Sequence, residues 1–161
     1  MQSAGRSTSM TIPDTAISVL VIDDEHDVAR AIEVTLSRAG FRVVLASDGL
    51  EGLRTFHRVD PDVVILDVGL PDRDGWEVLQ RIRELSEVPV MMLTARSGET
   101  DEILGFNMGA DDYVTKPFRV QPLIHRIKAM LRKSDTTETA KNVLTLHDIE
   151  IDRTNHTVRY N

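Results

Sequence analysis

A chain of 161 residues with 41% hydrophobic content can build one well-buried domain with a small appendage, but not two full domains. The absence of cysteine excludes disulfides and thiolate metal sites, and it favours a reducing cytoplasm as the compartment. Acidic residues outnumber basic ones by 26 to 19, and the net charge of -7 argues against a chain that binds nucleic acid through its overall field. Residues 1–15 are expected to form a disordered tail rather than a signal peptide, and no later run is apolar for long enough to span a membrane.

Short β-branched runs alternate with helical patterns from Ser18 onward, which predicts repeated βαβ units. The run Val-Val-Ile-Leu at 63–66 is continuously apolar, as expected of a strand that helices cover on both faces. We therefore predict an α/β fold, built on a doubly wound parallel sheet with helices on both faces. Its five strands are predicted at 18–22, 41–46, 62–66, 89–93 and 113–115.

The helices between these strands are marked by capping residues and by the 3.6-residue period. Asp48 and Asp74 have the sequence context of N-cap residues, each followed three positions later by Glu, and Gly40 ends the first helix. The last helix of the domain is predicted at about 119–133, with Pro122 in its first turn, where a missing N–H is tolerated. The inward-facing apolar positions of the third helix are predicted to be Val78, Leu79, Ile82 and Leu85.

The core domain is expected to span residues 16–133, and the composition changes beyond it. Residues 134–142 read Ser-Asp-Thr-Thr-Glu-Thr-Ala-Lys-Asn, a polar stretch that we interpret as a linker. Residues 143–161 alternate between apolar and polar side chains, which predicts a two-stranded hairpin that turns near 153–155. Such a hairpin alone is marginally stable.

Polar side chains follow the predicted strands at the edge where a doubly wound sheet binds its ligands. Asp23 and Asp24 follow the first strand, Asp67 the third, Thr94 the fourth and Lys116 the fifth. Three carboxylates so close together need positive charge, and Mg²⁺ is a hard cation that suits them. Lys116 and the Thr94 hydroxyl can hold phosphoryl oxygens, which leaves Asp67 as the attacking carboxylate. The sequence thus predicts a site that forms an acyl phosphate.

Each of these residues also has a purely structural interpretation. Asp23 and Asp24 suit the positive end of the following helix, and Asp67 suits a turn. Thr94 suits a helix cap, and Lys116 suits a solvated loop. Because all five are expected at one edge of one sheet, we favour the functional interpretation.

The chain resembles the receiver domain of a two-component response regulator. The resemblance covers roughly residues 16–133 and implies the flavodoxin-like strand order 2-1-3-4-5. Its four motifs occur in the expected order on the expected elements. They are Val-Leu-Val-Ile-Asp-Asp-Glu at 19–25, Asp-Val-Gly-Leu-Pro-Asp-Arg-Asp-Gly at 67–75, Leu-Thr-Ala-Arg at 93–96 and Gly-Ala-Asp-Asp-Tyr-Val-Thr-Lys-Pro-Phe at 109–118.

This resemblance implies a metal site and a protein partner. Asp23 and Asp24 would help to bind Mg²⁺, together with Asp67 and the backbone carbonyl of Val68. A sensor histidine kinase would supply the phosphoryl group to Asp67. The domain would then be a phospho-accepting signalling domain rather than an enzyme, with self-phosphorylation and slow self-dephosphorylation as its only reactions.

The resemblance also implies a switch. Thr94 and Tyr113 resemble the switch pair, in which the hydroxyl moves toward the phosphoryl group and the aromatic ring turns inward behind it. The bond between Lys116 and Pro117 is expected to be cis, which would aim the lysine into the site. No role is assigned to Trp76, which is expected to be partly exposed.

The C-terminal segment resembles the opening strands of the winged-helix effector domain of OmpR/PhoB-type regulators. The matching residues are 144–152, followed by Thr157 and Val158. We therefore interpret residues 143–161 as the start of a truncated DNA-binding domain, and the chain as a fragment of a transcription regulator. Because no recognition helix follows, specific DNA binding is expected only of a chain with the full effector domain.

Regulators of that type dimerise through the fourth helix, fifth strand and fifth helix, with a basic residue paired to a glutamate. Here Glu102 and Pro122 occupy these two positions, so we expect a weakened or altered homodimer. Other charges could form other pairs, although exposed ion pairs are individually weak. These charges are Asp111, Asp112, Arg126, Lys128 and Lys133.

Two other functions are alternatives to that of a transcription regulator. One is a stand-alone receiver or phosphorelay protein without DNA-binding output. The other is an aspartate-nucleophile phosphatase, which needs a second acid where this chain has Gly69. Because Gly69 and Arg96 offer neither a carboxylate nor an amide to orient water, we also expect slow self-dephosphorylation.

Overall fold

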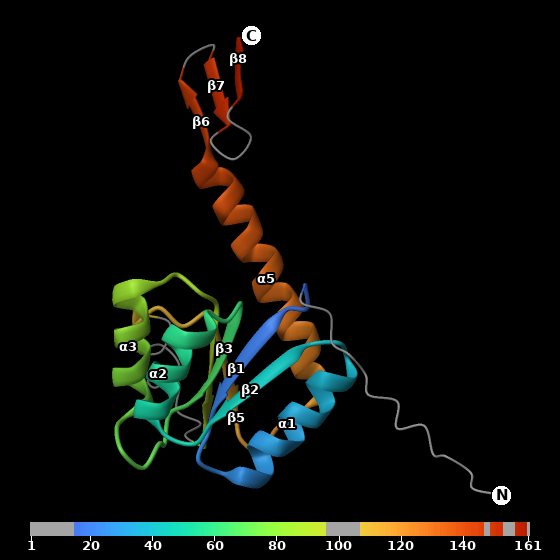
Figure 1. The fold of residues 1–161 in the computed structure, drawn as a ribbon, viewed down its shortest axis with the longest axis vertical. Coiled ribbons are helices and arrows are strands. Elements are labelled where there is room, and N and C mark those ends of the chain that lie inside the picture. The colour runs from blue at the N-terminus through green and yellow to red at the C-terminus, as the bar shows by residue number, and fades with distance from the viewer. Residues whose placement is uncertain (1–14, 96–106, 147–148, 153–156, 161) are drawn as a thin grey trace, which may run out of the picture.

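The computed structural model describes residues 15–95, 107–146, 149–152 and 157–160. It confirms the doubly wound α/β fold, with five parallel strands in the order β2-β1-β3-β4-β5 and helices on both faces (Figure 1). Every predicted strand is present, with boundaries that differ by at most one residue. The strands are β1 (Ser18–Ile22), β2 (Arg42–Ala46), β3 (Val63–Asp67), β4 (Val90–Thr94) and β5 (Asp112–Thr115).

The sheet separates two hydrophobic clusters, and two helices of the described part of the chain cover each of them. Helices α1 (His26–Arg38) and α5 (Gln121–Asn142) pack on one face, and α2 (Gly49–Val59) and α3 (Gly75–Leu85) pack on the other. Successive residues of each strand contribute to opposite clusters. Both faces are therefore apolar, which explains the continuous hydrophobic runs of the central strands.

The predicted helix ends are confirmed where the structure describes them. The Asp48 carboxylate accepts a hydrogen bond from the Glu51 N–H at 2.8 Å, and Glu51 in turn accepts from the Ser47 N–H at 2.8 Å. Asp74 accepts from the N–H of Trp76 at 3.0 Å. These bonds fix the starts of α2 and α3, which lie at the same edge of the sheet as the predicted site.

The end of α5 differs from the prediction. The helix begins at Gln121, with Pro122 in its first turn as expected, but it continues to Asn142. The polar segment 134–142, interpreted as a linker, is therefore helical. It contains neither glycine nor proline to end a helix, so its polar composition alone does not stop the helical hydrogen bonding.

The C-terminal segment forms a three-stranded antiparallel sheet beyond α5 (Figure 1). Its strands are β6 (Val143–Leu146), β7 (Ile149–Asp152) and β8 (Thr157–Tyr160). The prediction of a two-stranded hairpin was wrong because the chain also reverses between Leu146 and Ile149, which face each other across the sheet. The predicted turn at 153–155 lies outside the described residues, between the antiparallel strands β7 and β8.

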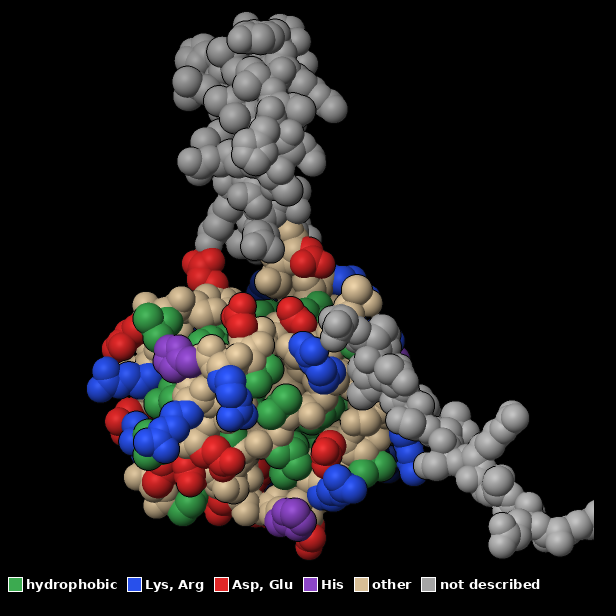
Figure 2. All heavy atoms as spheres, viewed as in Figure 1, with side chains coloured by type: hydrophobic (Ala, Val, Ile, Leu, Met, Phe, Trp, Pro, Cys, Tyr) green, Lys and Arg blue, Asp and Glu red, His purple; other side chains and the backbone are tan. Residues whose placement is uncertain are grey.

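Several sequence predictions fall on parts of the chain that the structure does not describe. They concern the tail at 1–14 and the positions of Arg96 and Glu102. No helix in the described part is long and apolar enough to cross a membrane. On the face of the five-stranded domain drawn in Figure 2, acidic and basic side chains are interspersed, as expected of an acidic chain without a single basic field.

Candidate functional site

Four of the predicted site residues meet at the carboxyl edge of the parallel sheet. Asp23 follows β1, Asp67 ends β3, Thr94 ends β4 and Lys116 follows β5. Asp23, Asp67 and Thr94 are all buried. A pocket of about 220 Å³ lies here, lined by Glu25, Asp67, Val68, Gly69, Asp74, Thr94, Ala95 and Lys116. The parallel register thus brings together residues that are far apart in the sequence.

Lys116 lies at the centre of the charged groups. Its Nζ is 3.0 Å from Oδ2 of Asp23, 3.0 Å from Oε1 of Glu25 and 3.3 Å from Oδ2 of Asp67. Burial lowers the pKa of Lys116, but the hydrogen bonds to Asp23 and Glu25, together with the charges of Asp23 and Asp67, raise it by more, so the net shift is upward. The amine therefore stays protonated at neutral pH. The predicted cis bond between Lys116 and Pro117 is present.

Opposing effects act on the pKa of Asp67. Burial raises the pKa of its carboxyl, and the charge of Asp23 raises it further, while Lys116 and the Gly69 N–H oppose the rise. The Gly69 N–H donates to Oδ1 of Asp67 at 3.2 Å. The net shift of the Asp67 pKa is upward, so additional positive charge at this edge would stabilise the ionised form of Asp67.

The acidic residues that gather at this edge include one that the sequence analysis left without a role. Oxygens of Asp23, Glu25 and Asp67 lie within 4.8 Å of one another, a donor set suited to a hard divalent cation. Asp24, which was predicted as a ligand, is exposed and is not part of this group. The Asp23 N–H donates to the Ala46 oxygen at 3.1 Å, so the backbone of Asp23 extends the pairing of β1 with β2 by one residue.

A tight loop joins β3 to α3 directly after Asp67. The Val68 carbonyl, predicted as a metal ligand, accepts a hydrogen bond from the Gly75 N–H at 2.9 Å and is thus engaged within the loop. A Cβ at Gly75 would overlap the backbone oxygen of Asp67, so only glycine allows α3 to start this close to the site. Gly75 belongs to one of the sequence motifs, but this close approach of the backbone to Asp67 cannot be inferred from the motif alone.

The predicted switch pair occupies neighbouring strands. Thr94 is 1% exposed, and Tyr113 is buried in the cluster beneath α2 and α3. The Tyr113 ring stacks on Trp76, with centroids 6.3 Å apart and planes 10° apart. The prediction that Trp76 is partly exposed was wrong, since it is 8% exposed. The apolar stripe of α3 begins at Trp76 and ends at Ile82, whereas Leu85 is 67% exposed.

Comparison with known proteins matches this geometry to one family. Residues 19–128 match the family model described as the response regulator receiver domain. A structure from Chloroflexus aurantiacus, described as a response regulator, is 38% identical, with a TM-score of 0.69, covering 73% of this chain and 98% of that one.

Two further solved structures are similar over the same region. The receiver domain of Francisella response regulator 1452 is 32% identical, with a TM-score of 0.70, covering 73% of this chain and 98% of that one. The BeF3-activated N-terminal receiver domain of RstA from Klebsiella pneumoniae is 29% identical, with a TM-score of 0.68, covering 71% and 98%. The chain therefore belongs to the response regulator receiver domain family, the phospho-accepting signalling domains of two-component systems.

Proposed function

We propose that Asp67 accepts a phosphoryl group from a sensor histidine kinase in the presence of Mg²⁺. The observation that carries this proposal is the position of Asp67 at the end of β3. Its carboxylate is nearly buried, lies 3.3 Å from the protonated amine of Lys116 and adjoins the carboxylate of Asp23. A nucleophile, a cation and a hydroxyl are thus arranged around one small pocket.

The side chains would divide the chemistry as follows. An Asp67 oxygen forms a bond to phosphorus while the bond from phosphorus to the donor's histidine nitrogen breaks, which leaves an acyl phosphate. Lys116 and the Thr94 hydroxyl, which line the same pocket, bind phosphoryl oxygens. Mg²⁺, when bound, supplies positive charge to the transferred group. Asp23 and Asp67 would hold the ion, together with Glu25 or with Asp24, the ligand that the family motif favours.

The test is direct phosphorylation in solution. Incubated with Mg²⁺ and acetyl phosphate, the protein should gain the mass of one phosphoryl group, and Asp67→Asn should gain none. Asp60→Asn is the matched control, because Asp60 is an exposed acid at the end of α2. Wild-type protein that stays unmodified would reject the proposal.

We further propose that phosphorylation changes a surface that includes β5 and α5, and that a longer chain uses this change to control transcription. The fourth helix expected from the family resemblance would belong to this surface, but its residues lie outside the described part of the chain. The antiparallel strands β6 to β8 after α5 support the likeness to a winged-helix effector domain. The alternative is a stand-alone receiver without DNA-binding output. Reporter transcription that does not respond to Asp67→Asn in the full gene product would favour this alternative.

A homodimer through this surface is proposed to be weakened or altered. Asp112 is bound within the chain to Arg126 at 2.9 Å, and Asp111 to Arg83 at 2.8 Å. Intermolecular pairs at these positions would first have to break existing ones, and Pro122 offers no charge. Sedimentation of the phosphorylated protein should therefore show a weak dimer, and a tight dimer through this face would contradict the proposal.

A further inference from the structure

The loop between β3 and α3 is fastened to the start of α2. The carboxylate of Asp72, in this loop, accepts hydrogen bonds from the N–H groups of Gly49 at 2.7 Å and Leu50 at 2.9 Å. These bonds join segments that are 23 and 22 residues apart in the sequence. They satisfy two amides at the start of α2 that have no partner within a helix.

The neighbouring residue packs against the same helix start. A Cβ built on Gly49 would lie 2.5 Å from Cγ of Arg73 and 2.7 Å from its Cδ, so a larger residue at 49 would force the Arg73 side chain to shift. Hydrogen bonds and packing thus hold the loop at one place. We name this contact, formed by Gly49, Leu50, Asp72 and Arg73, the loop brace.

The other end of the same loop forms part of the phosphoryl pocket. Val68 and Gly69 line the pocket, and the Gly69 N–H donates to Oδ1 of Asp67. A shift of the loop would therefore move the donor that orients the Asp67 carboxylate. When the Asp67 carboxylate already has the correct orientation in the metal-free protein, less conformational entropy is lost when Mg²⁺ binds.

We propose that Asp72 is a positioning residue for the phosphoryl site, acting through the loop brace rather than by contact with the metal or the phosphoryl group. This inference rests on the proposed function of Asp67. It assigns to Asp72 a role in the affinity for Mg²⁺ beyond its contribution to the stability of α2. Its removal loosens the loop and hence the Gly69 N–H that orients Asp67.

The chain offers a matched control at the same helix terminus. Asp48 also caps α2, through the Glu51 N–H, but it precedes the helix in the chain and does not connect it to the loop. Asp72→Ala and Asp48→Ala therefore each remove a capping carboxylate from α2, and only the first breaks the loop brace. Gly49→Ala perturbs the brace in a second way, by displacing Arg73 while keeping every hydrogen-bonding group.

The experiment measures Mg²⁺ binding by calorimetry and the rate of phosphorylation by acetyl phosphate against Mg²⁺ concentration, at a temperature where circular dichroism shows each variant folded. Asp72→Ala should bind Mg²⁺ about tenfold more weakly, the scale typical of residues that orient metal ligands. Its phosphorylation rate should approach that of the wild type at saturating Mg²⁺. Gly49→Ala should behave similarly, and Asp48→Ala should match the wild type in both measurements.

Two results would overturn the inference. One is an Asp72→Ala variant with wild-type affinity for Mg²⁺, and the other is an equal loss in Asp48→Ala. If Asp72→Ala fails to fold, Asp72→Asn replaces it, because its amide oxygen keeps one acceptor and should give an intermediate loss. A wild-type protein that is not phosphorylated rejects the proposed function, whereas a phosphorylated wild type with an unaffected Asp72 variant rejects only this inference.

Discussion

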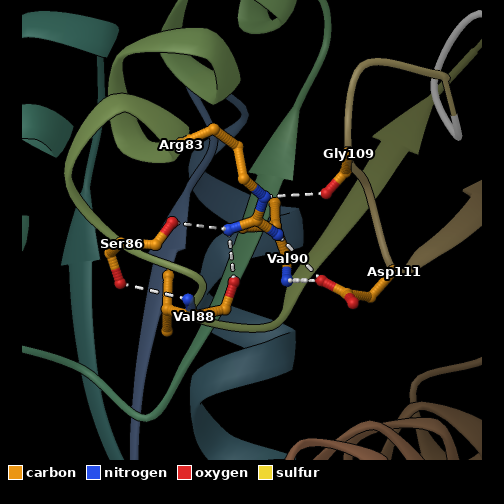
Figure 3. Close-up of polar contacts among 6 residues, drawn as sticks. All are labelled: Arg83, Ser86, Val88, Val90, Gly109 and Asp111. Carbon is orange, nitrogen blue, oxygen red and sulfur yellow. Dashed lines mark hydrogen bonds and ion pairs between the residues drawn. The ribbon is translucent and has the colours of Figure 1, made fainter. Parts of the chain in front are cut away.

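Arg83 and Asp111 join the end of α3 to the turn before β5, with Nη2 of Arg83 2.8 Å from Oδ2 of Asp111 (Figure 3). The same guanidinium donates to the carbonyl oxygens of Gly109 at 2.8 Å and Val88 at 2.6 Å. Asp111 also accepts the Val90 N–H at 2.9 Å. The Arg83 side chain is only 20% exposed, so one partly buried cation holds three segments together.

Replacement of Arg83 by alanine should lower the free energy of unfolding by about 2 kcal/mol, because it leaves partly buried acceptors without their charged donor. Arg81→Ala is the control on the same helix. Arg81 pairs with Glu84 at 3.5 Å, and both side chains are more than half exposed, so its loss should change stability by less than about 0.5 kcal/mol. Urea unfolding at neutral pH measures both, and equal losses would contradict this account.

The pH dependence of stability should report the environment of Asp67. Because its pKa is raised in the folded state above the ordinary value of 3.8, the folded protein binds the proton more tightly than the unfolded chain. The contribution of Asp67 to the free energy of unfolding therefore falls as the pH rises from the ordinary value of 3.8 through the raised pKa of the folded state. At neutral pH without Mg²⁺, Asp67→Asn should be more stable than the wild type, and the difference should vanish in acid below the unfolded value.

The effect of Mg²⁺ on the stability of the wild type and of Asp67→Asn supplies the control. Mg²⁺ should stabilise the wild type by offsetting the repulsion between Asp67 and Asp23, and it should stabilise Asp67→Asn much less. Thermal unfolding with and without Mg²⁺, at pH 7 and in acid, measures both effects. An Asp67→Asn variant that is less stable than the wild type at pH 7 without Mg²⁺ would contradict the assigned direction.

The sheet and most of the site were predictable because their signals are local. A strand buried on both faces requires a continuous apolar run, and the parallel direction places the following polar residue at one edge. Asp67, Thr94 and Lys116 could be assigned in this way without knowledge of any long-range contact. The N-caps at Asp48 and Asp74 are equally local, since each depends on the next three residues.

The features that the sequence analysis missed depend on packing between distant segments. Trp76 is buried because Tyr113 of β5 stacks on it, and Asp72 matters because α2 passes beside its loop. Neither contact has a sequence spacing that predicts it. The place of Glu25 beside Asp23 and Asp67 likewise depends on how the chain folds after β1, which hydrophobic periodicity does not fix.

The stack of Trp76 on Tyr113 provides an optical test of the switch. Trp76 is the single tryptophan of the chain, so its emission reports one position. If phosphorylation of Asp67 moves the Tyr113 ring, acetyl phosphate with Mg²⁺ should change the Trp76 emission, since the Tyr113 ring stacks directly on the indole. Asp67→Asn should give no change with acetyl phosphate. Emission of the phosphorylated wild type that equals the unphosphorylated signal would show that Tyr113 stays in place.

The lifetime of the phosphorylated protein should depend on the side chain at position 69. Gly69 lines the phosphoryl pocket, and a Cβ built there meets no atom within 4 Å, so a larger residue fits. Gly69→Asn would bring an amide able to orient water toward the acyl phosphate, and we expect hydrolysis to accelerate about tenfold or more. Gly69→Ala is the matched control, because it makes the same backbone change without a polar group. Decay of the phosphorylated mass with time measures both variants, and equal lifetimes would mean that water orientation at this position does not limit the reaction.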